Sequence, residues 1–132
     1  MLFRRLLGAL ALSSLVLPVF AANTLTPPKK ASLLILDGKS AASVDGQSGI
    51  KLDNGRHQLV FQIKTLVRDN GGNELYTSTP FIMTFNLKGD QAYSIKHPVL
   101  RSGSDTERLE RSPEKQLSLI NASGQAVPFE LK

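Results

Sequence analysis

Apolar and polar side chains alternate in three stretches of the chain, and such alternation is typical of strands that bury one face. The stretches cover residues 59–64, 81–87 and 92–97. Their odd-numbered positions are mostly large and apolar, and most aromatic residues after position 21 lie here, so we expect the core to form around them. The side chains expected to face the core are Leu59, Phe61, Ile63, Phe81, Met83, Phe85, Leu87, Tyr93 and Ile95.

Turn-forming residues separate these stretches from one another and from shorter apolar runs. Asp37-Gly38 follows the apolar run 33–36, and this dipeptide supplies the positive φ angles of a type I′ hairpin turn. Further turn sequences occur at residues 45–46, 53–55, 69–73 and 89–90. Strands about 8–12 residues apart with such turns predict an all-β fold, a single antiparallel β-sandwich. An immunoglobulin-like sandwich of about seven strands is the preferred architecture, and a small barrel is the alternative.

The C-terminal third of the chain is less regular. Residues 102–115, SGSDTERLERSPEK, are polar and charged, and either a loop or one short helical turn would fit them. Residues 116–131 hold two short apolar runs about Ser123-Gly124, which predict two closing strands. Helical periodicity of useful length is not found after residue 21, so the fold is expected to depend on strands.

The first residues have the pattern of a secretory signal peptide. A basic start with Arg4 and Arg5 precedes an apolar run over residues 6–20, and Val19-Phe20-Ala21 has small side chains where signal peptidase needs them. The run is shorter than the roughly 18 residues of a membrane-spanning helix, although an uncleaved anchor is the alternative interpretation. We expect a signal peptide at 1–21, a polar lead-in at 22–31, a sandwich domain at 32–132, and a periplasmic location without a membrane span.

The amino-acid composition and net charge reduce the classes of partner that we expect for this protein. The chain has no cysteine, so we expect it to fold on its apolar core without disulfides. The formal net charge is +5 at pH 7, but the basic residues are scattered and no arginine-rich strip with interleaved aromatics occurs. Nucleic acid is therefore not an expected partner.

Residues with catalytic or metal-binding chemistry are sparse. His57 and His97 are far apart in the chain, and zinc needs three or four converging ligands. His57 opens a strand directly after the turn at residues 53–55, so we interpret it as part of the seam of a β-hairpin. Five of the six aspartates lie beside glycine or asparagine, where they shape turns: Asp37, Asp45, Asp53, Asp69 and Asp90. We therefore expect no catalytic, cofactor or metal site, and the protein is not expected to be an enzyme; the pattern assigns no partner-binding residues.

Three segments carry a resemblance to a known family. They are LLILDGK at 33–39, IKLDNGRHQLVFQI at 50–63 and LYTSTPFIMTFN at 75–86, of which LDNGRHQLVF is the most specific. Together they resemble the YccT-like (UPF0319-type) family of small periplasmic proteins of gammaproteobacteria. The resemblance implies members that continue past the position of Lys132 into a more helical segment, so this chain looks shortened at its C-terminus.

The same resemblance implies a function. One member of that family is described as a curli synthesis inhibitor, which restrains polymerisation of the amyloid subunit curlin. The implied partner is the major curlin subunit or another envelope protein, bound at a strand edge guarded by charge or proline. Such guards are available at Lys29, Lys30, Pro98 and Pro128. The alternative is an envelope-associated structural module that binds a cell-wall or surface polysaccharide.

Overall fold

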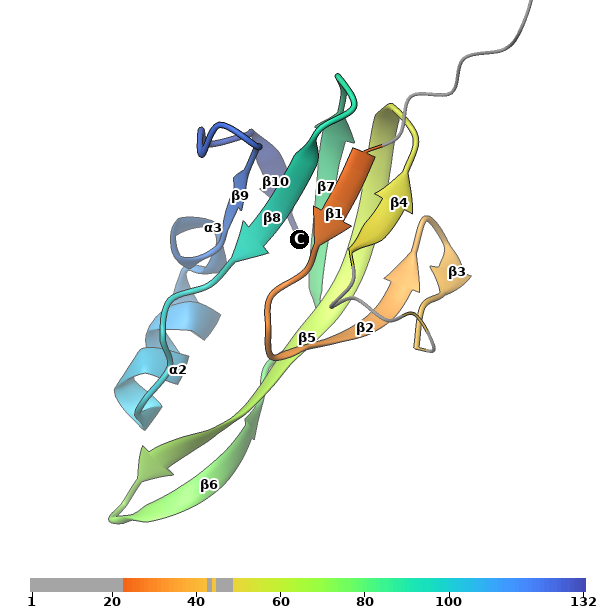
Figure 1. Ribbon diagram of the computed structural model, residues 1–132. Coiled ribbons are helices and arrows are strands. Elements are labelled where there is room, and N and C mark those ends of the chain that lie inside the picture. The colour runs from red at the N-terminus through yellow and green to blue at the C-terminus, as the bar shows by residue number, and fades with distance from the viewer. Residues whose placement is uncertain (1–22, 43, 45–48) are drawn as a thin grey trace, which may run out of the picture.

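The computed structural model describes residues 23–42, 44 and 49–132 of the chain. The predicted signal peptide at 1–21 and the predicted turn at 45–46 lie outside the described residues. The described part forms two β-sheets and two short helices, α2 (Gly103–Arg111) and α3 (Pro113–Gln116) (Figure 1). None of the helices in this part of the chain has the length and hydropathy needed to cross a bilayer.

The smaller sheet joins short strands from distant parts of the chain. They are β1 (Asn23–Thr26), β4 (Ile50–Leu52), β8 (Ala92–Lys96) and β9 (Ser118–Ile120), in the order β4–β1–β8–β9. β1 pairs antiparallel with β4 and parallel with β8, and β9 pairs antiparallel with β8. Because β1 and β8 are parallel, the chain segments that follow them leave the sheet at the same end.

The larger sheet is built around one long strand. Its order is β10 (Phe129–Leu131), β7 (Phe81–Leu87), β5 (Gly55–Asp69), β2 (Ala31–Leu36) and β3 (Lys39–Ser40), and every neighbouring pair is antiparallel. β5 crosses the whole molecule in Figure 1. Only its first half lies between β7 and β2, because the registers with those strands end at Phe61 and Ile63 respectively.

The second half of β5 forms a hairpin with β6 (Gly72–Thr77), which extends away from the two sheets beside α2 (Figure 1). Its turn is the predicted Asn70-Gly71, and both residues have positive φ angles, 51° and 80°. Asp37-Gly38 likewise turns β2 into β3 with φ angles of 50° and 82°. These values are those of type I′ turns, so the hairpin prediction at Asp37-Gly38 and the turn prediction at residues 69–73 are confirmed.

The core lies between the two sheets, and every side chain predicted to face it is buried. Leu25 of β1, Leu109 of α2 and Leu119 of β9 add to the same cluster. The predicted all-β sandwich is therefore confirmed. Within the described strands neither sheet closes on itself, so the barrel alternative is wrong.

Three predictions about local structure are corrected. Residues 23–31 were expected to lie outside the domain, but β1 lies inside the smaller sheet and Asn23 and Leu25 are completely buried. Residues 102–115 form helices rather than a loop or one turn, and Asp105 caps α2 by accepting hydrogen bonds from the backbone N–H groups of Arg101 and Ser102. The turn at residues 53–55 does not close a hairpin, because β4 and β5 belong to different sheets.

Candidate functional site

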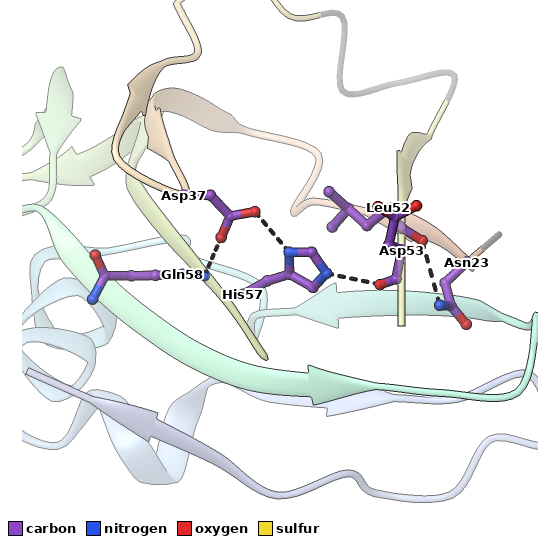
Figure 2. Close-up of polar contacts among 6 residues, drawn as sticks. All are labelled: Asn23, Asp37, Leu52, Asp53, His57 and Gln58. Atoms are coloured by element: carbon purple, nitrogen blue, oxygen red, sulfur yellow. Dashed lines mark hydrogen bonds and ion pairs between the residues drawn. The ribbon is translucent and has the colours of Figure 1, made fainter. Parts of the chain in front are cut away.

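His57 lies where the chain crosses from the smaller sheet to the larger one (Figure 2). Its strand neighbour is Phe85 of β7, with ring centroids 6.3 Å apart. The interpretation of this position as a hairpin seam is therefore wrong in one respect: the seam joins two sheets rather than two strands of one hairpin. It is correct that His57 opens a strand directly after a turn.

Both ring nitrogens of His57 meet oxygen acceptors. Nδ1 is 2.6 Å from a carboxylate oxygen of Asp37, and Nε2 is 2.8 Å from the backbone carbonyl of Asp53. A neutral imidazole carries only one N–H, so the two contacts are satisfied together only by the doubly protonated ring. Burial lowers the pKa of His57, but the hydrogen bonds and the nearby carboxylates of Asp37 and Asp53 outweigh it and raise that pKa above 6.5.

These contacts connect three segments. The second carboxylate oxygen of Asp37 accepts a hydrogen bond of 2.8 Å from the backbone N–H of Gln58. On the far side of the crossover, the buried Asn23 side chain donates to the Leu52 carbonyl (Figure 2). It also donates to the Asn54 side chain. Because both nitrogens of His57 already donate to fixed partners, neither is free to bind a metal ion or to remove a proton from a substrate. The cluster therefore connects the turn at Asp37 to the start of β5 and to the turn at Asp53.

The remaining ionisable residues do not gather into a ligand set. His97 lies after β8, and its Nδ1 is 2.6 Å from the carbonyl of Pro98. Among residues 23–42, 44 and 49–132, no three His, Cys, Asp or Glu side chains converge closely enough to hold a metal ion.

The β5–β6 hairpin carries the most exposed pair of large apolar side chains on a strand. Leu66 of β5 and Leu75 of β6 are directly opposite each other in the register, and they are 66% and 69% exposed. Side chains of opposed residues share a face of the sheet, so Lys64 and Arg68 lie on the same face at either end of this pair. The hairpin thus presents an apolar centre between two positive charges.

The outer side of β6 is an unpaired strand edge. β6 pairs with β5 alone in the described part of the chain. Hydrogen-bonded pairs alternate along an antiparallel ladder, and the bond of 2.9 Å from the N–H of Ser78 to the carbonyl of Ile63 fixes their phase. The backbone groups of Asn73, Leu75 and Thr77 therefore point away from β5, toward open space.

Contacts with α2 hold this hairpin in place. One carboxylate oxygen of Glu110 accepts hydrogen bonds from the Tyr76 hydroxyl (2.7 Å) and the Thr79 N–H (2.9 Å), and the other accepts one from the Thr79 hydroxyl (2.7 Å). Burial opposes ionisation of Glu110, but these donors outweigh it and lower its pKa. Burial, together with the bond to Glu110, raises the pKa of Tyr76. The β6 strand, with its free edge, is therefore held against α2.

Comparison with known proteins identifies the family of this chain. The family described as "Uncharacterized protein conserved in bacteria (DUF2057)" matches residues 24–132. The chain belongs to this family. Membership agrees with the resemblance to YccT-like proteins, whereas the curli-inhibiting activity implied by that resemblance stays a prediction.

Curated relatives of this DUF2057 chain are UPF0319 proteins. That of Enterobacter sp. (strain 638) is 35% identical over 125 residues, which cover 92% of this chain and 56% of the relative. YccT of Escherichia fergusonii is 33% identical, and YccT of Escherichia coli O1:K1 is 34% identical, each over 124 residues that cover 91% of this chain and 56% of the relative. The chain thus spans about half the length of the curated relatives it matches. No solved structure matches it at a significant level.

The edge guards predicted from the sequence of this DUF2057 chain lie at two different places. Pro128 directly precedes β10, an edge strand of the larger sheet. Lys29, Lys30 and Pro98 lie in connections that leave the smaller sheet, and not on an edge strand. The residues on the β6 face that could guard an edge are instead Lys64 and Arg68. The sequence contains a signal for this pair, because Lys64 and Arg68 lie two positions before and after the apolar Leu66 in a strand.

Proposed function

We propose that this protein is a non-enzymatic periplasmic binding protein that restrains polymerisation of an amyloid subunit, with the major curlin subunit as the first candidate partner. The observation that supports this function is the outer edge of β6, with Leu75 and Leu66 exposed beside it. Amyloid grows when a strand adds to a free edge, and a folded domain with a free edge of its own competes for that strand.

The captured segment adds to β6 as one further strand. The outward backbone groups of Asn73, Leu75 and Thr77 pair with it, and the Leu66–Leu75 surface contacts one of its apolar side chains. Lys64 and Arg68 favour a segment in which acidic or amide side chains flank that apolar residue. Because α2 supports the hairpin through Glu110, little ordering of the edge is needed on binding.

Capture at this edge does not create a second growing surface. The opposite side of the far half of β5 is occupied by backbone carbonyls: that of Arg101 accepts a hydrogen bond of 2.9 Å from Arg68, and that of Lys30 accepts one of 2.8 Å from Lys64. A strand bound to β6 therefore becomes the third strand beside β6 and β5, and no further strand can add on the far side of β5. The domain acts as a cap on the strand it binds.

The test is curlin polymerisation followed by thioflavin fluorescence with and without equimolar purified protein. We expect a longer lag, and we expect Leu75→Pro to abolish it, because proline removes an N–H that faces the free edge while the bonds to β5 are kept. Ile35→Thr is the matched control, since Ile35 is another exposed apolar residue of the same sheet, 40% exposed. No delay by the native protein would exclude curlin as the partner. Equal loss in both variants would exclude the β6 edge.

The periplasmic location in this proposal is supported by the basic and apolar pattern of residues 1–21. Fractionation of cells that produce the full chain tests it. We expect the protein in the osmotic-shock fraction, shortened by the length of that segment. Recovery of the unshortened chain in the membrane fraction would instead support an uncleaved anchor.

A further inference from the structure

A groove opens where the two parallel strands of the smaller sheet end. Thr26 of β1 and Ser94 of β8 form the last pair of their register, and both chain segments leave the sheet there in the same direction. The segment after Thr26 turns toward β2, and the segment after β8 turns toward α2 (Figure 1). Two connections that diverge from the carboxyl ends of adjacent parallel strands leave a space between them, as in open α/β sheets.

The floor and walls of this groove are mainly apolar. Its volume is about 360 Å³, at the lower end of the range for small-molecule sites. Its lining includes Ile95 and Leu100 of the buried core, together with Pro27 and Pro28. Val99 also lines it, with 69% of its surface exposed, and so adds accessible apolar surface.

The charge of the groove has one sign. Lys29, Lys30 and Lys96 line it, and no acidic residue does. None of these three ammonium groups forms an ion pair with any carboxylate in the described part of the chain. Three unpaired cations around an apolar floor are complementary to a molecule with one anionic end and one apolar end.

We propose that this groove binds a single-chain anionic amphiphile, with the acyl chain on Ile95, Val99 and Leu100 and the carboxylate among the three lysines. The alkyl stems of the lysines can lie along the chain while their ammonium groups reach the carboxylate. None of the β6 residues and neither Leu66 nor Arg68 lines the groove, and Lys30 takes part in the hairpin only through its backbone carbonyl. The site is therefore independent of the function proposed above.

The test is a titration of the purified protein with dodecanoate below its micelle concentration, followed by calorimetry and by NMR shifts of the Val99 and Leu100 methyl groups. Dodecyltrimethylammonium tests the requirement for the anion, and butanoate tests the requirement for the chain. We expect saturable binding of dodecanoate alone, with shifts concentrated at these methyl groups. Equal binding of dodecyltrimethylammonium, or of butanoate, or no binding of dodecanoate would overturn the proposal.

Variants test the contribution of the lysines. We expect the Lys29→Ala, Lys30→Ala and Lys96→Ala triple variant to bind dodecanoate about tenfold more weakly, the combined effect of three partly exposed ion pairs. The matched control removes the same charge elsewhere, at the exposed Lys39, Lys51 and Lys88. Equal weakening in both triple variants would show that binding depends only on the net charge of the protein, and it would contradict binding in this groove. Val99→Asp changes an exposed residue, so it keeps the fold and should also weaken binding.

Discussion

The two halves of β5 continue the same two faces of one strand but have different surroundings. In the first half, Leu59, Phe61 and Ile63 face the core and are completely buried, and the strand has β7 on one side and β2 on the other. In the second half, Leu66 is exposed, and β6 is the only strand beside it within the described residues. One strand thus contributes both to the centre of the core and to the hairpin whose other strand, β6, has a free edge.

The difference shows what alternation determines and what it leaves open. A period of two sorts side chains onto two faces, but the neighbouring elements decide which face is covered. In the first half the smaller sheet covers the face of Phe61. In the second half α2 covers the opposite side of the hairpin, where Val67 is buried and Tyr76 contacts Glu110, and so Leu66 faces solvent. The following experiments test this contrast, in order of expected effect.

Phe61→Ala should have the largest effect. The Phe61 ring is completely buried and packs edge-to-face on Phe81 with centroids 5.8 Å apart, so its removal leaves a cavity in the centre of the core. We expect the free energy of unfolding to fall by about 3–5 kcal/mol in urea denaturation. Leu66→Ala in the same strand is the control and should change it by less than about 0.5 kcal/mol. Similar losses in the two variants would contradict the contrast.

Glu110→Ala should come next, and its effect should be local. The substitution removes the acceptor of three hydrogen bonds from Tyr76 and Thr79, and one of the donors, the half-buried Tyr76 hydroxyl, needs a partner. We expect a loss of about 1–2 kcal/mol and faster amide hydrogen exchange in β6 than in β7. Glu107→Ala, on an exposed position of the same helix, is the control. Uniformly faster exchange across both strands would show that the hairpin is not a separate unit.

The His57 cluster should contribute a smaller, pH-dependent term. The folded-state pKa of His57 is raised, so the stability it adds is present below its unfolded value of 6.5 and is lost as the pH rises through the folded value. The difference in unfolding free energy between the native protein and His57→Gln should therefore be larger at about pH 5.5 than at about pH 8.5. Asp37→Asn should remove most of this dependence. A difference that grows with pH would mean that the ring is bound in its neutral form.

Much of the fold could be predicted because it depends on local chemistry. Alternation identified the buried faces of β5, β7 and β8, and the turn residues Asp37-Gly38 and the cluster at 69–73 identified the turns after β2 and β5. Sheet membership could not be predicted in this way, since it depends on contacts between distant segments. The turn at residues 53–55 has the residues of a hairpin turn yet joins two sheets, and β1 is a short strand that pairs with partners far along the chain.

The helix and the candidate binding edge were missed for different reasons. α2 had a local signal, because Ser102 and Asp105 have the spacing of a capping box before a helix whose buried residue is Leu109. The edge had a weak signal, because Leu66 lies at an even-numbered position of its strand, on the face of Lys64 and Arg68 and not on that of Phe61 and Ile63. That no further strand pairs with β6 in the described part of the chain depends on contacts between distant segments, which the sequence pattern does not give.

Leu75→Thr should have the smallest effect on folding, and it is the sharpest test of the contrast for that reason. Leu75 is 69% exposed, so little apolar surface returns to water when it is replaced, and threonine suits a strand as well as leucine does. We expect a change within about 0.5 kcal/mol in urea unfolding, independent of protein concentration. A loss that grows with protein concentration would show that a second copy covers this surface, because association adds to the apparent stability of the native state. With the expected result, the Leu66–Leu75 surface contributes almost nothing to folding, and its exposed apolar area is available for a partner.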